Sequence, residues 1–160
     1  MPARNCLSAW GDRKTSSPEA SPPAIAKDYD LSNNPRMNAI SEPLLLIVDD
    51  SRMSRMLIKA IVAEARPTWR IVEASTGDEA VRVVAEREPN FVSMDVNMPG
   101  ISGLEAAGRI RLHHPAVKIA LCSANIQEST REAAARAGLH FVAKPITPQS
   151  VKSAIDFFES

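Results

Sequence analysis

From residue 44 onward, short apolar runs alternate with amphipathic segments of helical spacing, and this alternation limits the fold more than any other feature of the chain. Five apolar runs are predicted to be strands, and the segment after each one is predicted to be a helix. Strict alternation of this kind indicates a parallel sheet with helices on both faces. The predicted strands are residues 44–48, 69–73, 90–95, 117–122 and 139–143, and the predicted helices are residues 51–65, 77–87, 103–114, 126–137 and 149–160.

The length of the repeating region selects one arrangement of the sheet. The five units occupy residues 44–160, whereas a closed barrel of eight units needs about twice that length. We therefore predict an α/β fold with a doubly wound, five-stranded parallel sheet, the strand order 2-1-3-4-5 and five helices.

Capping side chains and apolar faces support the predicted helices. A polar side chain before the first turn accepts a backbone hydrogen bond that the helix itself leaves unmade. The predicted caps are Thr76 with Glu79, Ser102 with Glu105, Asn125 with Glu128, and Thr147 followed by Pro148. The predicted apolar faces are Met53, Met56, Leu57, Ala60 and Ile61 in the first helix, Ile126, Ala133, Ala134 and Ala137 in the fourth, and Val151, Ala154, Ile155 and Phe158 in the fifth.

The composition changes near residue 43. Residues 1–43 contain six of the twelve prolines and have neither a helical nor a strand period. We predict a disordered N-terminal tail over residues 1–43 and one domain over residues 44–160. Met37 lies shortly before the first strand and is an alternative start of translation.

Charge and cysteine content exclude several classes of protein. The formal net charge is zero, so electrostatics gives no reason to expect binding to nucleic acid or to an anionic membrane. Cys6 and Cys122 do not form a disulfide framework, and Cys122 lies in an apolar run as expected of a buried, reduced thiol. The sequence contains no signal peptide and no apolar stretch of membrane-spanning length. We therefore expect a cytoplasmic protein.

Polar residues stand at the carboxyl ends of four predicted strands, which is where open parallel sheets bind ligands. Because the first and third strands are neighbours in the predicted order, their acidic ends would lie side by side. The residues are Asp49 and Asp50 after the first strand, Asp95 at the end of the third, Ser123 after the fourth, and Lys144 with Pro145 after the fifth.

Three carboxylates, a hydroxyl and an ammonium group at one edge favour one kind of chemistry. The carboxylates repel one another unless a cation lies among them, and a set of oxygen ligands favours Mg²⁺ or Mn²⁺ over zinc. Lys144 would attract an incoming anion. Such a set suits phosphoryl transfer onto a carboxylate, and Asp95 is the predicted acceptor.

Four sequence motifs together resemble the receiver domain of two-component response regulators. They are "LLLIVDDSRMSR", "MDVNMPGISGLE", "ALCSA" and "FVAKPI". The resemblance covers residues 44–160, implies a flavodoxin-like receiver fold, and is nearest in architecture to the single-domain chemotaxis regulators.

The resemblance assigns roles to individual residues. It implies that Asp95 is the phosphoacceptor and that Mg²⁺ is bound directly by Asp50, through water by Asp49 and by the backbone carbonyl of Asn97. It also implies that Ser123 and Lys144 bind the phosphoryl group and that the Lys144–Pro145 peptide is cis. Phe141 would occupy the position of a switch aromatic. For Phe141, a plain core role remains an equal alternative.

The resemblance also implies a function. A histidine kinase or phosphotransfer protein would donate the phosphoryl group, and the surface of helix 4, strand 5 and helix 5 would then change and bind a protein target. The expected protein is a stand-alone signalling domain, not a turnover enzyme, and is a monomer or a weak dimer that depends on phosphorylation. A phosphate sink or relay without an output of its own is the alternative.

Two rival classes fit the residues less well. Hydrolases of the haloacid dehalogenase type also form an aspartyl phosphate, but they carry a second aspartate where this chain has Asn97. Flavodoxin-like binders of flavin mononucleotide need a loop rich in Ser and Thr after the first strand, whereas this loop begins "DDSRMS" and would repel a phosphate.

Overall fold

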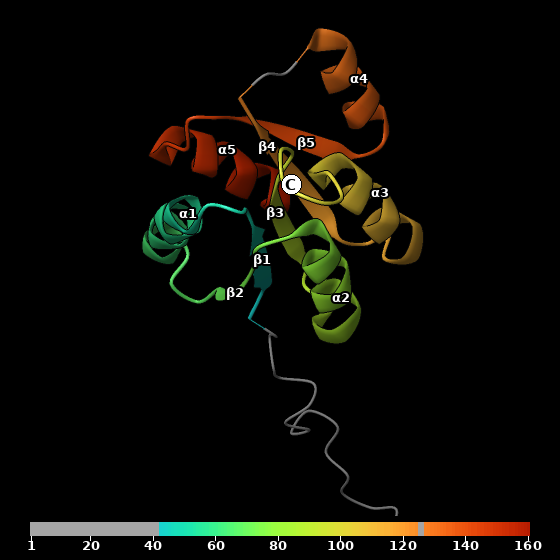
Figure 1. Ribbon diagram of the computed structural model, residues 1–160. Coiled ribbons are helices and arrows are strands. Elements are labelled where there is room, and N and C mark those ends of the chain that lie inside the picture. The colour runs from blue at the N-terminus through green and yellow to red at the C-terminus, as the bar shows by residue number, and fades with distance from the viewer. Residues whose placement is uncertain (1–41, 125–126) are drawn as a thin grey trace, which may run out of the picture. The chain divides into compact units, whose positions relative to one another are not determined.

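A computed structural model of the chain describes residues 42–124 and 127–160 (Figure 1). Strands and helices alternate throughout this part of the chain, as predicted. The elements are β1 Leu44–Val48, α1 Arg52–Ala65, β2 Arg70–Ala74, α2 Gly77–Arg87, β3 Phe91–Asp95, α3 Gly103–His113, β4 Lys118–Ser123, α4 Glu128–Arg136, β5 Leu139–Ala143 and α5 Pro148–Glu159. Most of the predicted tail, together with the predicted cap Asn125 and the predicted face residue Ile126, lies outside the described residues.

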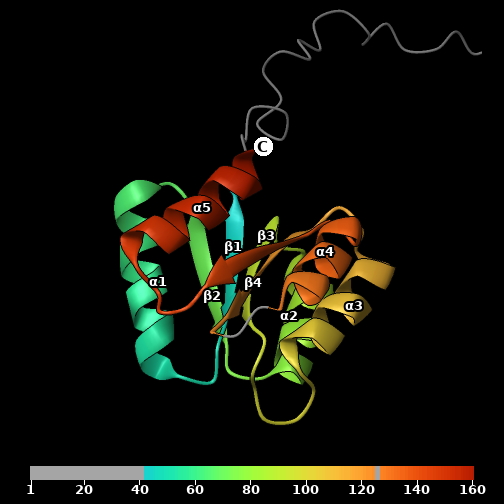
Figure 2. The same cartoon turned by 90° about the horizontal axis from the view of Figure 1, so that it is seen from above.

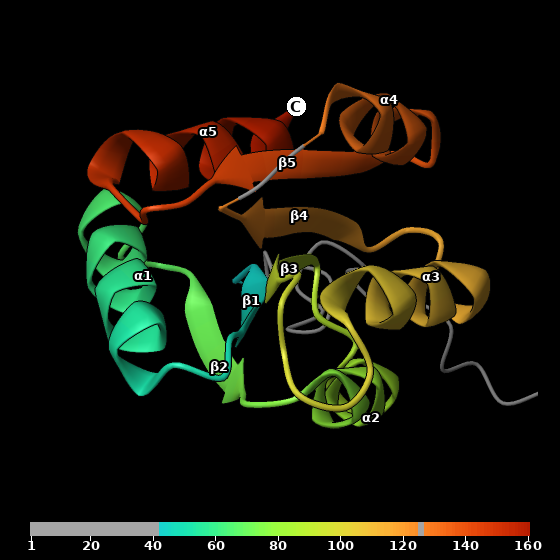
Figure 3. The same ribbon diagram turned by 45° about the horizontal axis from the view of Figure 1, so that its top comes forward.

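The five strands form one parallel sheet in the order β2-β1-β3-β4-β5, which confirms the predicted fold (Figure 3). All five residues of β1 are buried, because this strand has neighbours on both sides and helices on both faces. The register pairs Asp95 with Cys122 and Ser123 with Ala143. The ends of β3, β4 and β5 therefore lie at one edge of the sheet.

Helices α2, α3 and α4 cover one face of the sheet (Figure 2). Small side chains dominate this layer, so the helices approach the strands closely. Removing each larger aliphatic side chain from water contributes about 1.5–3 kcal/mol to stability. The buried hydrophobic residues described on these helices are Ala80 and Val84 of α2, Ala106, Ala107 and Ile110 of α3, and Ala134 of α4.

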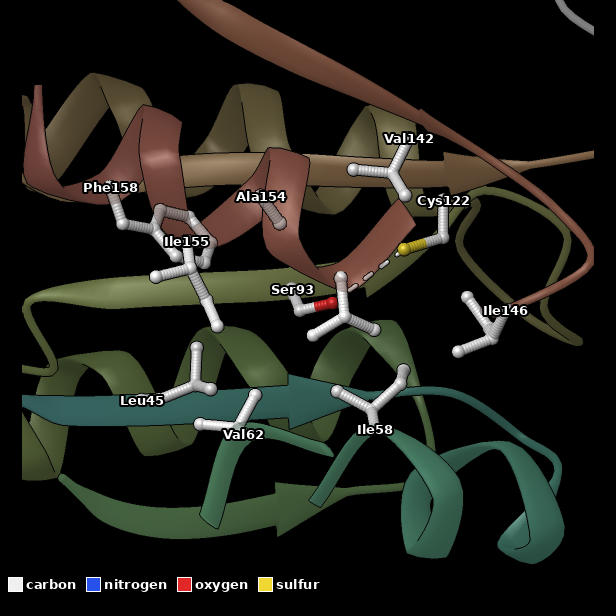
Figure 4. Close-up of a pocket in the computed structure, with 11 residues that line it drawn as sticks. Leu45, Ile58, Val62, Ser93, Cys122, Val142, Ile146, Ala154, Ile155 and Phe158 are labelled. Atoms are coloured by element: carbon white, nitrogen blue, oxygen red, sulfur yellow. Dashed lines mark hydrogen bonds between the residues drawn. The ribbon is translucent and has the colours of Figure 1, made fainter. Parts of the chain in front are cut away.

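Helices α1 and α5 cover the opposite face. The Phe91 ring lies 4.7 Å from that of Trp69 and 4.9 Å from that of Phe158, measured between centroids. Between these helices and the sheet remains a cavity of about 10 Å³, which is room for one water molecule at most (Figure 4). Ser93 Oγ and Cys122 Sγ lie 3.6 Å apart beside this cavity, and Cys122 is a free, buried thiol as predicted.

Most of the predicted apolar face of α1 does not pack on the sheet, although Ile61 is half-buried against the core. Met53, Met56 and Leu57 are 74%, 52% and 45% exposed, whereas Ile58 and Val62 are buried. Apolar residues occupy more than one side of this helix, so spacing alone did not identify the buried side. The predicted face of α5 is buried in full.

The described caps follow the sequence pattern. Thr76 and Ser102 accept hydrogen bonds from the backbone amides of Glu79 and Glu105, although the Glu79 carboxylate accepts from the amide of Ser75 and not from that of Thr76. Thr147 and Ser150 form a reciprocal capping box around Pro148, the first residue of α5. None of the helices among the described residues has the length and apolar character needed to cross a membrane.

Candidate functional site

The loop after β1 holds the first two acidic residues. Asp49 is 1% exposed, its backbone amide donates to the carbonyl oxygen of Ala74 over 3.3 Å, and its Oδ1 accepts from the amide of Ser51 over 2.8 Å. Asp50, the next residue, is exposed. One carboxylate is therefore held in the interior while its neighbour faces solvent.

The end of β3 holds the third acidic residue. Asp95 is 4% exposed, and its Oδ1 accepts from the amide of Asn97 over 3.2 Å. The first residue of α3, Gly103, lies against the backbone of Asp95 so closely that a Cβ atom at position 103 would overlap the Asp95 carbonyl oxygen. Glycine at this position lets the helix begin beside the acid.

Lys144 brings a positive charge to the same edge. Its Nζ lies 2.9 Å from Asp95 Oδ2 and 3.1 Å from Asp49 Oδ2, and the Lys144–Pro145 peptide is cis, as the resemblance implied. Burial by itself lowers the pKa of Lys144, but the hydrogen bonds with Asp95 and Asp49 and the negative charges of the two carboxylates together outweigh burial, so its pKa lies above the ordinary lysine value. The side chain is therefore an ammonium group at neutral pH.

The three carboxylates form one cluster. Asp49, Asp50 and Asp95 each offer an oxygen, and these atoms all lie within 4.8 Å of one another. With the ammonium group of Lys144 the cluster has a formal charge of −2 (three negative charges and one positive). A divalent cation would balance that charge, and a set of oxygen donors with one member open to solvent fits Mg²⁺ or Mn²⁺.

The other predicted residues lie around this cluster. Ser123 is buried at the end of β4, and its carbonyl oxygen accepts from the amide of Lys144 over 2.9 Å. Asn97 is exposed in the loop after β3. Phe141 is half-buried, lies opposite Leu121 of β4 and packs against the core on the face covered by α2, α3 and α4, so it is not a member of the acidic cluster.

Two residues that contact the site were missed by the sequence analysis. Gly103 stands at the start of a predicted helix, where a glycine without an obvious turn is a sign of close backbone approach. Arg55 lies one turn into α1, and its Nη1 donates to the carbonyl oxygen of Asp49 over 2.7 Å. A basic residue shortly after an acidic pair was the available signal.

Comparisons with known proteins agree with this arrangement. The family model of the response regulator receiver domain matches residues 45–156. The chain is 37% identical over 114 residues to the chemotaxis protein CheY of Thermotoga maritima, which covers 70% of this chain and 93% of that protein. It is 44% identical over 72 residues to a protein-glutamate methylesterase/protein-glutamine glutaminase of Hahella chejuensis, which covers 44% of this chain and 20% of that protein.

A solved structure has the same fold. The chemotaxis response regulator CheY4 of Vibrio cholerae is similar with a TM-score of 0.66 at 20% identity, over 74% of this chain and 99% of its own. The sheet order, the acidic cluster beside Lys144 and the match of the family model over most of the described residues lead to one conclusion. The chain belongs to the family of response regulator receiver domains, the CheY-like signalling domains of two-component systems.

Proposed function

We propose that this protein is a stand-alone response regulator that accepts a phosphoryl group on Asp95 from a histidine kinase or a phosphotransfer protein. One observation carries the proposal: carboxylate oxygens of Asp49, Asp50 and Asp95 lie within 4.8 Å of one another, and Lys144 Nζ lies 2.9 Å from Asp95. Phosphoryl transfer onto a carboxylate needs a nucleophilic oxygen surrounded by positive charge. The cluster supplies the oxygen and one of the positive charges.

The chemistry of the donor set suits Mg²⁺, with Mn²⁺ as a substitute. Asp50 and Asp95 would bind the ion directly, Asp49 through a water molecule, and Asn97 through its backbone carbonyl. When bound, the ion neutralises charge on the transferring phosphoryl group. The formal charge of −2 on the cluster supports a divalent ion.

The transfer itself is an in-line displacement. A carboxylate oxygen of Asp95 forms a bond to phosphorus while the bond from phosphorus to the donor's imidazole nitrogen breaks, and the nitrogen keeps that electron pair. Lys144 then pairs with the phosphoryl oxygens, and the hydroxyl of Ser123 donates a hydrogen bond to them. Water later hydrolyses the acyl phosphate and restores Asp95, so the domain acts as a timed signal and not as an enzyme with an external substrate.

The same step would change the surface formed by α4, β5 and α5. Phosphorylation replaces the single negative charge of the Asp95 carboxylate with close to two on an acyl phosphate, whose oxygens lie farther out, so Lys144 and the Ser123 hydroxyl would move to pair with them. Lys144 directly follows β5, so its movement reaches Phe141 on that strand. Ala134 is the one residue of α4, among those whose side chains are described, that is buried, and an apolar face built from alanine gives up little buried area when the helix shifts. The shifted surface would bind a downstream protein target.

Intact-mass spectrometry after incubation with acetyl phosphate tests the proposal. Wild type should gain one phosphoryl group in Mg²⁺ and none in a chelator, Asp95→Asn should gain none, and Asp50→Asn should react slowly because it lacks a direct metal ligand. A wild-type chain that is folded but gains no mass in Mg²⁺ would refute the proposal.

A second experiment separates an output protein from a sink or relay. Phe141→Ala should weaken phosphorylation-dependent capture of a target at least about tenfold while phosphorylation by acetyl phosphate changes less than about twofold, because Phe141 lies outside the acidic cluster. If the phosphorylated protein retains only its phosphodonor, the sink or relay is the correct description.

The remaining properties follow from the same proposal. The protein would act in the cytoplasm as a monomer or as a weak dimer that depends on phosphorylation, with protein partners and without nucleic acid or membrane binding. The net charge of zero supports the absence of a nucleic-acid partner.

A further inference from the structure

Arg55 is a largely buried cation next to the acidic cluster. Its side chain is 15% exposed, which is low for an arginine. Its Nη1 donates to the carbonyl oxygen of Asp49 over 2.7 Å, and its Nε donates to Glu73 Oε2 over 3.0 Å. The guanidinium group therefore joins the loop after β1 to the edge strand β2.

The carbonyl group that Arg55 holds belongs to the peptide between Asp49 and Asp50. Fixing that oxygen fixes the plane of the peptide, and the plane sets the direction in which the side chain of Asp50 leaves the backbone. Asp49 is also held by the amide of Ser51 and by Lys144, whereas Asp50 is exposed and depends on the peptide before it for its position.

Glu73 holds Arg55 in turn. Glu73 Oε2 accepts the bond from Arg55, and Glu73 Oε1 accepts from Lys59 Nζ over 3.1 Å. The hydrogen bonds from Lys59 and Arg55 keep the pKa of Glu73 below its ordinary value. Glu73 is therefore a carboxylate at neutral pH, and a charge-assisted bond to a carboxylate orients a planar guanidinium group better than a neutral bond does.

We propose that Arg55, held by Glu73, is a positioning residue that orients the Asp49–Asp50 peptide for Mg²⁺ binding. The inference rests on the proposed function, in which Asp50 is a direct ligand of the ion. Groups that orient metal ligands without touching the metal commonly change metal affinity by 10–100-fold. Arg55 has no place in the chemistry of transfer itself, so its effect is on how readily the ion binds.

A positioning role and a purely electrostatic role make opposite predictions. As a nearby cation, Arg55 repels Mg²⁺, so its loss would tighten binding if charge were its only effect. As a positioning residue, its loss weakens binding. Arg55→Lys keeps the positive charge but lacks the planar guanidinium group that reaches two partners. It should therefore bind Mg²⁺ like wild type if Arg55 acts only through its charge, and like Arg55→Met if Arg55 is a positioning residue.

Calorimetric titration of the full-length chain with Mg²⁺ tests the inference. Arg55→Lys and Arg55→Met should both bind Mg²⁺ about tenfold more weakly than wild type, and Glu73→Ala should show a smaller loss in the same direction. Lys59→Met is the matched control, because Lys59 is on the same helix and also binds Glu73 but makes no bond to Asp49. Its affinity for Mg²⁺ should stay within about twofold of wild type.

Two further readouts separate positioning from a loss of structure. Thermal unfolding without Mg²⁺ establishes whether each variant is folded. If an Arg55 variant does not fold, Glu73→Ala still tests the inference, because this substitution leaves α1 unaltered. In saturating Mg²⁺, the rate of phosphorylation by acetyl phosphate should return to within about threefold of wild type in the Arg55 variants, which a damaged fold would not allow.

The outcomes distinguish the inference from the proposed function. If wild type binds Mg²⁺ and both Arg55→Lys and Glu73→Ala bind it equally well, the inference is wrong and the proposed function stands. If Arg55→Met binds more tightly, Arg55 acts only through its charge and the inference is also wrong. If wild type itself does not bind Mg²⁺, the proposed function fails and the inference fails with it.

Discussion

At the scale of single residues, the site depends on how closely the start of α3 approaches the end of β3. Gly103 allows that approach because it has no side chain to meet the carbonyl oxygen of Asp95. Gly103→Ala should lower the free energy of unfolding by about 1–3 kcal/mol and slow phosphorylation, because the backbone of Asp95 must move.

Gly108 is the matched control in the same helix, since a Cβ atom there meets nothing within 4 Å. Gly108→Ala should stabilise by about 0.5–1 kcal/mol, and urea denaturation measures both. Equal effects at the two positions would contradict this account.

The thiol of Cys122 gives a second prediction at this scale. Burial raises its pKa from 9.0 to about 11, although the hydrogen bond with Ser93 opposes the change. At pH 8 the folded chain then carries about 100-fold less thiolate than an exposed cysteine. Because the folded state holds the proton more tightly, the thiol contributes stability below about pH 9, and that contribution is lost as the pH rises through about 11.

Alkylation by iodoacetamide measures this protection. In a Cys6→Ser chain, where Cys122 is the remaining thiol, modification at pH 8 should be at least about 100-fold slower in the folded protein than in urea. Similar rates in the two conditions would show that the thiol is not buried as described.

The residues found from the sequence and those missed differ in one physical respect. Asp49, Asp50, Asp95 and Lys144 stand at or directly after the ends of apolar strands, and a charge at that place is visible in the sequence. The role of Arg55 depends on a bond from its side chain to a carbonyl oxygen, and a basic residue after an acidic pair does not by itself specify that bond. The chemical role assigned to each acid remains a prediction.

At the scale of elements, α1 shows where periodicity is insufficient. Its boundaries were predicted to within one residue, but its buried side was not, because apolar residues lie on two sides of the helix. Caps and strand lengths depend on local sequence and were predictable. The choice of buried face depends on packing against β1 and α5, which no local pattern contains.

Two neighbouring positions on α1 test the observed orientation. Ile58 is 3% exposed and Leu57 is 45% exposed. Ile58→Ala should lower the free energy of unfolding by about 2–5 kcal/mol through lost burial and a residual cavity, whereas Leu57→Ala should change it by less than about 1 kcal/mol, since alanine also favours the helix. Denaturant titration of both variants decides the matter, and a larger loss at Leu57 would mean that the helix packs through its other side.

At the scale of the whole molecule, the strand order brings the acids together. Asp50 and Asp95 are far apart in the sequence and meet because β1 and β3 are neighbours. That order was predictable from the alternation, from the length of the chain and from the right-handed rule for crossovers. The site is therefore a consequence of the topology as much as of its residues.

The boundary near residue 43 remains a prediction of the sequence pattern. Limited proteolysis should cleave within residues 1–43 and leave a resistant fragment that begins near residue 44, because backbone that is not packed is cut first. The fragment should still gain a phosphoryl group from acetyl phosphate in Mg²⁺. Early cleavage inside residues 44–160, or a fragment that no longer reacts, would place the boundary elsewhere.

Locating the phosphoryl group is the most direct test of the account. Borohydride reduces an aspartyl phosphate to homoserine, and peptide mass mapping identifies the residue that has changed. After incubation with acetyl phosphate in Mg²⁺, homoserine should appear at position 95 and, among the acidic residues, nowhere else, and it should be absent when a chelator is present. Homoserine at position 49 or 50 would show that Asp95 is not the acceptor. The same conclusion would follow if the protein gained a phosphoryl group but homoserine appeared at none of its acidic positions.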